Sequence, residues 1–340
     1  EVAFNAVRKV HDLGRRLDQR PWMLTVSFTH PHDPYVARRK YWDLYEDCAH
    51  LDPETAPIPY EQQDPHSQRL MDACDFRALD ITPDDVQRSR RAYFANITYV
   101  DDKIGEILAA LDGTRQTDNT IVVFVSDHGD MLGERGLWFK MSFFEGSASV
   151  PLMIAAPGLP AGRVDTPVST MDLTPTLCDL AGISLEKIAP WTDGQSLVPL
   201  AHGAARTEPV RIEYAAEGSV APMVCLRAEQ WKYTLCRADG AQLFDITSDP
   251  NELSNLAGDP DHAETLERFA AMAAQYWDLD AYDAEVRASQ ARRHVVYAAL
   301  RNGAYFPWDF QPLQQASERY MRNHMDLNVL EESKRFPRGE

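Results

Sequence analysis

Residues 120–140 read TIVVFVSDHGDMLGERGLWFK, a β-branched and aromatic run that is followed at once by charged side chains. The first six residues have the composition of a buried strand, and Asp127 and His128 follow where that strand ends. Ligands of open α/β sheets bind beyond the carboxyl ends of the strands. A carboxylate next to an imidazole suits a divalent metal ion. The stretch therefore predicts an α/β fold with a metal-binding turn after this strand.

Three glycines follow this turn, at positions 129, 133 and 136. Glycine adopts positive φ without steric cost, so these positions predict tight turns that lead the chain back toward the strand end. Lys140 would then lie over the same site, where its ammonium group can hold an anionic oxygen. An Asp-His pair on its own is more often a turn-capping acid beside a surface histidine. The metal site therefore depends on further residues at the same edge of the sheet.

A second apolar strand is expected at Met23–Phe28, and it leads into the sequence THPHDP, which contains His30 and His32. We expect this strand and Thr120–Val125 to share one mixed or parallel sheet, with His32 and Asp127 facing a common cleft. A proline-rich turn often carries polar side chains without any function. The combination of two strand ends with a lysine downstream is what favours a catalytic site.

The remaining pattern alternates helices and strands up to about residue 205 and then changes to short, closely spaced strands, which predict a small antiparallel sheet. Thr82 and Pro83 are the expected N-cap and first residue of a helix that runs to about Leu111. Gly182 is expected to close another helix. The other expected helices are Val2–Leu17, Asp172–Ala181, Asp261–Leu279 and Asp283–Leu300. The other expected strands are Leu152–Ala155, Val210–Tyr214, Val220–Arg227, Trp231–Arg237 and Gln242–Phe244.

The composition limits the partners and the location. The 340 residues carry a formal net charge of −18, which argues against nucleic acid and an anionic membrane surface as partners. The five cysteines are scattered without a CxxC pair, which argues against disulfides and zinc–thiolate sites and favours the reducing cytoplasm. No run of about 18 apolar residues is present to cross a membrane. The sequence opens without an initiator methionine and within an amphipathic helix, which indicates a start inside a larger protein.

Five segments, in the same order, resemble those of the sulfatase family within the alkaline phosphatase superfamily. They are FTHPHDPY from residue 28, YVDDKIGEILAALD from residue 99, SDHGDMLGERGLWFK from residue 126, STMDLTPTLCDLAGI from residue 169 and LFDITSDPNELSNLA from residue 243. The resemblance implies an alkaline-phosphatase-like α/β fold, with a mixed, mostly parallel sheet flanked by helices, a small antiparallel C-terminal subdomain and a tail extension. The implied parts are the C-terminal part of the catalytic domain at 1–205, the subdomain at 206–280 and the extension at 281–340.

The tail sequence NGAYFPWDFQPLQQASERYMRNHMDLN, from residue 302, resembles the C-terminal extension of the choline sulfatase subgroup, and FKMSFFEGSASVPLMI from residue 139 is also close to that subgroup. The resemblance implies a sulfuric ester hydrolase that converts choline O-sulfate to choline and sulfate. It also implies a homo-oligomer in which the tail reaches a neighbouring subunit. Two other functions stay open, namely a phosphonate or phosphodiester hydrolase of the same superfamily and a non-catalytic assembly chain.

Carried over residue by residue, the resemblance assigns the metal ligands to Asp127 and His128, with one divalent cation, Ca²⁺ before Mn²⁺ or Mg²⁺. Lys140 matches the family lysine that contacts the sulfate group. His32 matches the histidine near the leaving group, and His30 is a second candidate for that place. Sulfatases attack the sulfur with a formylglycine made from a cysteine or serine, while the metal ion neutralises the sulfate oxygens.

The family nucleophile has no match in this chain. None of the five cysteines lies in the C-x-P-S-R or C-x-A-x-R signature, and the paired aspartates of the family's first strand are also missing. We therefore expect the chain to correspond to the C-terminal two-thirds of a choline sulfatase, with the formylglycine in a missing N-terminal part. By itself the chain is expected to be inactive, because the reaction needs a covalent nucleophile.

The choline end of such a substrate needs particular partners. A quaternary ammonium group cannot donate a hydrogen bond, and it is held by carboxylates and aromatic faces. Glu217 follows the expected strand Val210–Tyr214 and falls where the family places a carboxylate near choline. Asp326 in the tail is the second candidate. The alternative for either acid is an ordinary solvated surface position.

Overall fold

The computed structural model describes residues 1–302 except residues 19, 47, 49, 50 and 78. The chain divides into two units. The first contains residues 1–52 and 79–118 together with the end of the last helix from residue 292, and the second contains residues 53–78 and 119–291.

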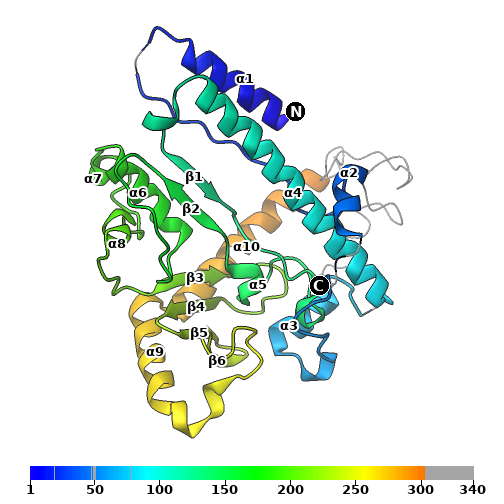
Figure 1. Cartoon of the computed structure of the whole chain (residues 1–340). Helices are drawn as coiled ribbons and strands as arrows, with labels where there is room; N and C mark the ends of the chain where they lie inside the picture. Colours follow the sequence, from blue (N-terminus) through cyan, green and yellow to red (C-terminus); the bar gives the residue numbers. More distant parts are fainter. Residues whose placement is uncertain (19, 47, 49–50, 78, 303–340) are drawn as a thin grey trace. The chain divides into compact units, whose positions relative to one another are not determined.

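The first unit is built around two helices, α1 (Val2–Gly14) and α4 (Pro83–Gly113), which pack against each other (Figure 1). The buried face of α1 consists of Ala3, Ala6, Val10 and Leu13. α4 begins as predicted, because Thr82 accepts a hydrogen bond from the N–H of Asp85 and the Asp85 side chain accepts one from the N–H of Thr82. This reciprocal capping satisfies donors that have no partner inside the helix, so the start of α4 is fixed by local sequence.

The predicted strand Met23–Phe28 is not a strand in the structure. Its side chains alternate between more and less exposed, as those of a strand would, but no other segment within the described part of the chain pairs with it. A strand needs a neighbour for its N–H and C=O groups, and the alternating sequence pattern does not say which segment supplies one. The short helix α2 (Arg39–Trp42) follows and contacts α4.

In the second unit, β1 (Val122–Val125) and β2 (Leu152–Ala155) form an antiparallel pair, with Val125 opposite Leu152. Both strands agree with the sequence prediction, and so does the α/β class. The strands are half-buried rather than buried, since Val125 is 36% exposed and Met153 is 60% exposed. The predicted sheet was mixed or parallel; among the described strands, the only neighbour of β1 is the antiparallel β2.

Helix α6 (Leu173–Leu180) follows a 3-10 turn that opens with a capping box between Ser169 and Asp172. Gly182 closes the region with a φ of 66°, as predicted. The remaining short helices are α3 (Pro65–Ala73), α5 (Glu145–Ala148), α7 (Leu185–Ile188) and α8 (Val198–Ala201). The 3-10 turns lie at Asp43–Tyr45, Tyr60–Gln62, Thr117–Asn119, Glu134–Gly136, Thr170–Asp172, Leu256–Gly258 and Pro260–His262.

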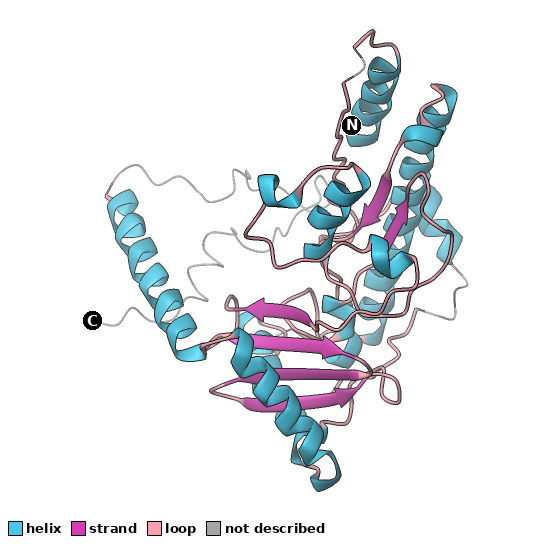
Figure 2. Ribbon diagram, turned by 90° about the vertical axis from the view of Figure 1, so that its left-hand side faces the viewer, coloured by secondary structure: helices cyan, strands magenta, loops and turns pink. Residues whose placement is uncertain are grey.

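The predicted antiparallel sheet is present and has four strands in sequence order. They are β3 (Val210–Tyr214), β4 (Met223–Ala228), β5 (Trp231–Cys236) and β6 (Gly240–Asp245). Helix α9 (Ala263–Tyr276) lies across one face of the sheet (Figure 2). Its Phe269 is fully buried against Leu226, Tyr233 and Leu243 of the strands. Burial of four large apolar side chains at about 1.5–3 kcal/mol each makes this contact the main core of the sheet.

The last described helix is α10 (Leu279–Arg301). The tail from residue 303, including Asp326, lies outside the described residues. The domain boundaries expected at residues 205 and 280 stay predictions. Among the residues that the structure describes, no helix combines the length and the apolar character needed to cross a membrane.

Candidate active site

The turn after β1 holds Asp127 and His128 in a defined orientation. Asp127 Oδ1 accepts the N–H of His128 at 3.0 Å, and His128 Nδ1 lies 2.8 Å from the carbonyl oxygen of Gly129. A carbonyl oxygen only accepts hydrogen bonds, so Nδ1 carries a proton. Nε2 lies 3.7 Å from Asp127 Oδ2. A backbone carbonyl that fixes the tautomer in this way is typical of histidines that bind metals.

The geometry of this pair fits two ligands of one divalent cation. Adjacent ligands at about 2.0–2.6 Å from an ion lie roughly 3–4 Å apart, as the two side-chain atoms do here. The Asp127 side chain is 86% exposed and therefore accessible to an ion. Partial burial raises its pKa, but the nearby imidazole and the backbone hydrogen bonds outweigh this, so the pKa of Asp127 is lowered and the carboxylate is ionised. Within the described ranges, no group of three or more His, Cys, Asp or Glu side chains is arranged to hold a metal.

The loop after this turn folds back on itself. The N–H of Met131 donates to the carbonyl of Phe139 at 2.8 Å, and Asp130 Oδ1 accepts the N–H groups of Leu132 and Phe139 at 2.9 and 3.0 Å. The main chain of Lys140 therefore returns to the turn, as the sequence predicted. The glycines at 133 and 136 have φ values of 91° and 80°, which confirms their predicted role.

Gly129 is needed for a different reason from the predicted one. It is not among the residues with positive φ; instead, a Cβ atom at this position would lie 2.2 Å from the carbonyl oxygen of Gly146. Its N–H donates to the carbonyl of Ser147 at 2.7 Å. The hydroxyl of Ser147 lies 2.5 Å from the carbonyl oxygen of Lys140. Ser147 thus joins the turn that carries Asp127 to the segment that carries Lys140.

His30 and His32 belong to the first unit. The His30 ring contacts the Tyr99 ring edge-on at 5.5 Å, and the Arg38 guanidinium lies over the same Tyr99 ring at 5.1 Å. Burial and the charge of Arg38 lower the pKa of His30, which keeps the imidazole neutral. His32 Nδ1 lies 2.8 Å from the carbonyl oxygen of Asp33 and 3.2 Å from its carboxylate. The predicted position of both histidines near the leaving group stays a prediction.

Glu217 is exposed and has an aromatic neighbour that sequence reasoning missed. The Tyr214 hydroxyl donates to Glu217 Oε2 at 3.2 Å and lies 3.0 Å from its carbonyl oxygen. Burial and the Glu217 carboxylate raise the pKa of Tyr214, so the phenol keeps its proton. The Tyr214 ring contacts the rings of Phe143 and His66 edge-on. The signal in the sequence was an aromatic residue at the end of a strand, three positions before the candidate acid.

His66 connects this aromatic group with the lysine loop. Its side chain is buried, and its Nε2 atom lies 2.6 Å from the carbonyl oxygen of Met141, the neighbour of Lys140. His66 is held on α3, whose first turn is capped by Asp64. The structure therefore links the backbone beside Lys140 to the Tyr214 ring within the second unit, through one histidine that the sequence analysis did not single out.

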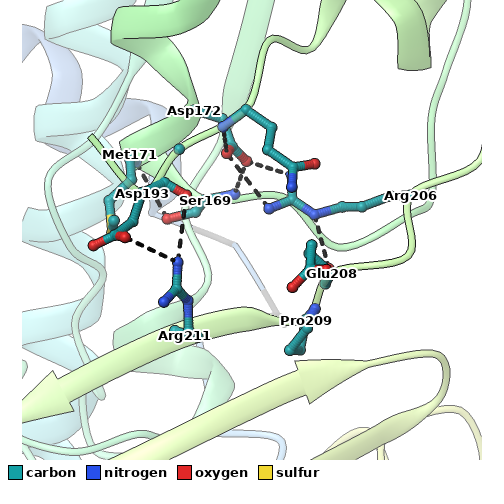
Figure 3. A pocket seen from close by; sticks show the side chains of 10 residues that line it. Ser169, Met171, Asp172, Asp193, Arg206, Glu208, Pro209 and Arg211 are labelled. Carbon is teal, nitrogen blue, oxygen red and sulfur yellow. Dashed lines mark hydrogen bonds and ion pairs between the residues drawn. The ribbon is translucent and has the colours of Figure 1, made fainter. Parts of the chain in front are cut away.

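A small polar pocket of about 90 Å³ lies elsewhere in the second unit (Figure 3). At its edge, the buried Asp172 forms an ion pair with Arg206 at 2.6 Å. Asp172 also accepts the N–H groups of Ser169 and Gln195, both at 2.8 Å. Both carboxylate oxygens are therefore satisfied by the protein itself. None of the predicted site residues lines this pocket, and its contacts are those of a structural ion pair.

Comparison with known proteins gives the class. The sulfatase family model matches residues 5–183, and a model of the C-terminal part of N-sulphoglucosamine sulphohydrolase matches residues 133–277. A crystal structure of a phosphonate monoester hydrolase from Agrobacterium radiobacter is 27% identical with a TM-score of 0.63, covering 81% of this chain and 61% of that one. A phosphonate monoester hydrolase from Silicibacter pomeroyi is 28% identical with a TM-score of 0.66, covering 79% and 59%. The chain belongs to the sulfatase family and has its alkaline-phosphatase-like fold.

Two further matches concern a particular subgroup. Residues 284–336 match the model of the choline sulfatase C terminus. A choline-sulfatase from Rhizobium meliloti (strain 1021) is 64% identical over 347 residues, which cover 100% of this chain and 68% of that protein. An arylsulfatase from Clostridium perfringens is 31% identical and covers 75% of this chain and 53% of that protein.

Proposed function

We propose that the protein hydrolyses choline O-sulfate to choline and sulfate. The observation that carries this proposal is the 64% identity to a choline-sulfatase over the whole chain, which includes the segments around Lys140 and Glu217. The match of residues 284–336 to the choline sulfatase C terminus supports the same substrate. A phosphonate or phosphodiester hydrolase is the second candidate, because two structural neighbours are phosphonate monoester hydrolases at 27% and 28% identity.

The sulfate end of the substrate is assigned to the second unit. Asp127 and His128 would hold a divalent cation, proposed to be Ca²⁺, since their pairing offers one carboxylate oxygen and one imidazole nitrogen. When bound, such an ion neutralises charge on sulfate oxygens and lowers the pKa of a nucleophile. Lys140 would bind a sulfate oxygen through its ammonium group. Its backbone is held by Ser147, so the ammonium group starts from a fixed Cα position.

The nucleophile is assigned to a formylglycine, as sulfatases use in general. No cysteine of these 340 residues lies in the formylglycine signature, so activity is measured on protein that carries the formylglycine. His32, or His30 as the second candidate, is proposed to protonate the leaving alcohol. The contact of His32 Nδ1 with the carbonyl of Asp33 at 2.8 Å orients the ring.

The choline end is assigned to Glu217 and the Tyr214 ring. The carboxylate supplies a negative charge, and the aromatic ring supplies a face for the trimethylammonium group, a contact worth about 0.5–2 kcal/mol. The hydrogen bond from Tyr214 to Glu217 fixes the carboxylate beside the ring. Asp326 is proposed as a further contact from the tail. The tail is also proposed to mediate a homo-oligomer, and the five free cysteines support a location in the cytoplasm.

A comparison of substrates tests the function. The formylglycine-bearing protein is assayed with choline sulfate and with a phosphonate monoester of the same alcohol. We expect kcat/KM for choline sulfate to exceed that for the phosphonate by at least about 10²-fold. This is the rate effect of one hydrogen-bond or charge contact that is made in the transition state of only one of the two substrates. A higher kcat/KM for the phosphonate would favour the second candidate. No turnover of either compound would favour the non-catalytic assembly chain.

A further inference from the structure

Helix α5 (Glu145–Ala148) contacts both parts of the sulfate site. The carbonyl of its Ser147 accepts the N–H of Gly129 at 2.7 Å, next to the Asp127–His128 turn. The hydroxyl of the same serine reaches the carbonyl of Lys140 at 2.5 Å and that of Ser142 at 3.0 Å. Yet α5 is a single turn of four residues. One helical turn fixes several dihedral angles for one hydrogen bond and is unstable alone, so other parts of the protein must hold it.

The support comes from a buried ion triad, made of Lys232, Glu145 and Glu252. Lys232 Nζ lies 2.9 Å from Glu145 Oε1 and 2.9 Å from Glu252 Oε1. The second contact is an ion pair without hydrogen-bond geometry. Glu252 Oε2 accepts the N–H of Glu145 at 2.7 Å, the first residue of α5. The Lys232 side chain is 1% exposed and that of Glu252 is 3% exposed, whereas Glu145 is 32% exposed.

One buried member of the ion triad lies on a strand, and the other lies in a loop that hydrogen bonds hold in place. Lys232 lies on β5, which is paired on both sides by β4 and β6. Glu252 has a φ of 55°, and its carbonyl accepts Arg135 Nη1 at 2.8 Å. Its N–H donates to the carbonyl of Asp249 at 3.1 Å. The ion triad therefore fixes where α5 begins relative to the four-stranded sheet, because Lys232 on β5 and Glu252 both contact Glu145.

The charges of Lys232 and Glu252 stabilise each other in the buried site. Burial alone would lower the pKa of Lys232, but the carboxylates of Glu252 and Glu145 outweigh burial and raise it. Burial raises the pKa of Glu252, and the Lys232 charge offsets part of this effect. Buried ion pairs are often no more stabilising than apolar residues of the same size, because desolvation is costly. The presence of three charged side chains here is therefore explained better by a role in fixing the geometry of α5 than by a contribution to the stability of the protein.

We propose that Lys232 and Glu252 are positioning residues for hydrolysis, which fix Lys140 and the Asp127–His128 turn through Glu145 and Ser147. This inference rests on the proposed function, since it assigns the sulfate end of the substrate to those residues. Neither residue touches the substrate in this account. Their loss displaces α5 and, with it, Lys140 and the Asp127–His128 turn. Both must lie within about 1 Å of their productive positions.

The test compares Lys232→Met, Lys232→Arg and Glu252→Gln with Arg206→Met in the active protein. Arg206→Met removes a different buried ion pair of the same unit, Arg206–Asp172, whose side chains have their other hydrogen-bond partners, Ser169, Gln195 and Glu208, outside α5. It is the matched control for simple destabilisation. Lys232→Arg keeps the charge, and Glu252→Gln keeps an acceptor for the N–H of Glu145, so these two variants remain informative if Lys232→Met does not fold.

Two measurements are made on each folded variant. Hydrogen exchange, followed by mass spectrometry, reports the opening of residues 139–148 independently of activity. Steady-state kinetics report kcat and KM separately for choline sulfate. We expect Lys232→Met to speed exchange in 139–148 and to lower kcat about 10²-fold with KM changed less than about threefold. Glu252→Gln should show a smaller loss of kcat than Lys232→Met, and Lys232→Arg should keep most of the wild-type kcat.

Several results would overturn the inference. One is unchanged exchange in residues 139–148 of Lys232→Met. Another is faster exchange there with wild-type kcat, and a third is an equal loss of kcat in Arg206→Met. If the wild-type protein does not hydrolyse choline sulfate, the proposed function fails, while the exchange measurement still decides whether the ion triad orders α5.

Discussion

The carbonyl oxygen of Ser147 accepts a hydrogen bond from the backbone nitrogen of Gly129 at 2.7 Å. This bond joins two segments that are 18 positions apart and that carry the proposed sulfate-binding groups on either side. Because the approach is so close, there is no room for a side chain at position 129. The geometry of the site therefore depends on backbone contacts as much as on the charged residues.

The first prediction concerns this close approach. In Gly129→Ala, the added Cβ would lie 2.2 Å from the carbonyl oxygen of Gly146, so the turn or α5 must move. We expect a loss of about 2 kcal/mol or more in the free energy of unfolding, measured with urea, and a strong loss of kcat. Gly162→Ala is the control, because no atom lies within 4 Å of a Cβ built there. Equal stability of the two variants would contradict the prediction.

The second prediction concerns Lys140. In the active protein, Lys140→Ala should lower kcat for choline sulfate by about 10²-fold or more, because the ammonium group meets the sulfuryl group, where charge moves during the reaction. Lys187→Ala removes an exposed lysine of α7 and should leave kcat unchanged. A Lys140→Ala enzyme that keeps wild-type kcat but has a raised KM would assign the lysine to ground-state binding instead.

The third prediction concerns pH. The pKa of His30 is lowered from 6.5 by burial and by Arg38, so below pH 6.5 the unfolded chain binds more protons than the folded protein. The stability contribution is fully present above about pH 6.5 and is lost as the pH falls through the lowered folded-state pKa. His30→Phe keeps a ring beside Tyr99 and should show a smaller drop in melting temperature between pH 7.5 and 5.

Arg38→Gln gives an independent check of the same cause. It removes the second contribution to the lowered pKa of His30, so the drop in melting temperature should be intermediate between wild type and His30→Phe. If all three proteins lose the same number of degrees, His30 does not contribute to the acid sensitivity of the protein.

The sequence predicted features whose causes are local. The Thr82 cap and the turn after β1 depend on residues within a few positions of one another, and each of the four short strands pairs with a strand next to it along the chain; all were found. The strand expected at Met23–Phe28 was wrong, because its periodicity cannot specify a partner. The ion triad was not foreseen, since Lys232 is 87 positions from Glu145. The tight packing at Gly129 likewise depends on a distant residue.

The central claim is that the protein recognises choline sulfate by its cation, and the specificity of Glu217→Gln tests it most directly. The measured quantity is the ratio of kcat/KM for choline sulfate to kcat/KM for 3,3-dimethylbutyl sulfate, the analogue with carbon in place of nitrogen, which lacks the positive charge. Glu217 would meet a group that changes little during the reaction, so its loss removes uniform binding and raises KM. We predict that Glu217→Gln lowers this ratio about tenfold, the equivalent of about 1.4 kcal/mol, while kcat/KM for the analogue without the positive charge stays within about twofold. An equal loss on both substrates would contradict the account, because Glu217 would then act on the structure and not on the choline group.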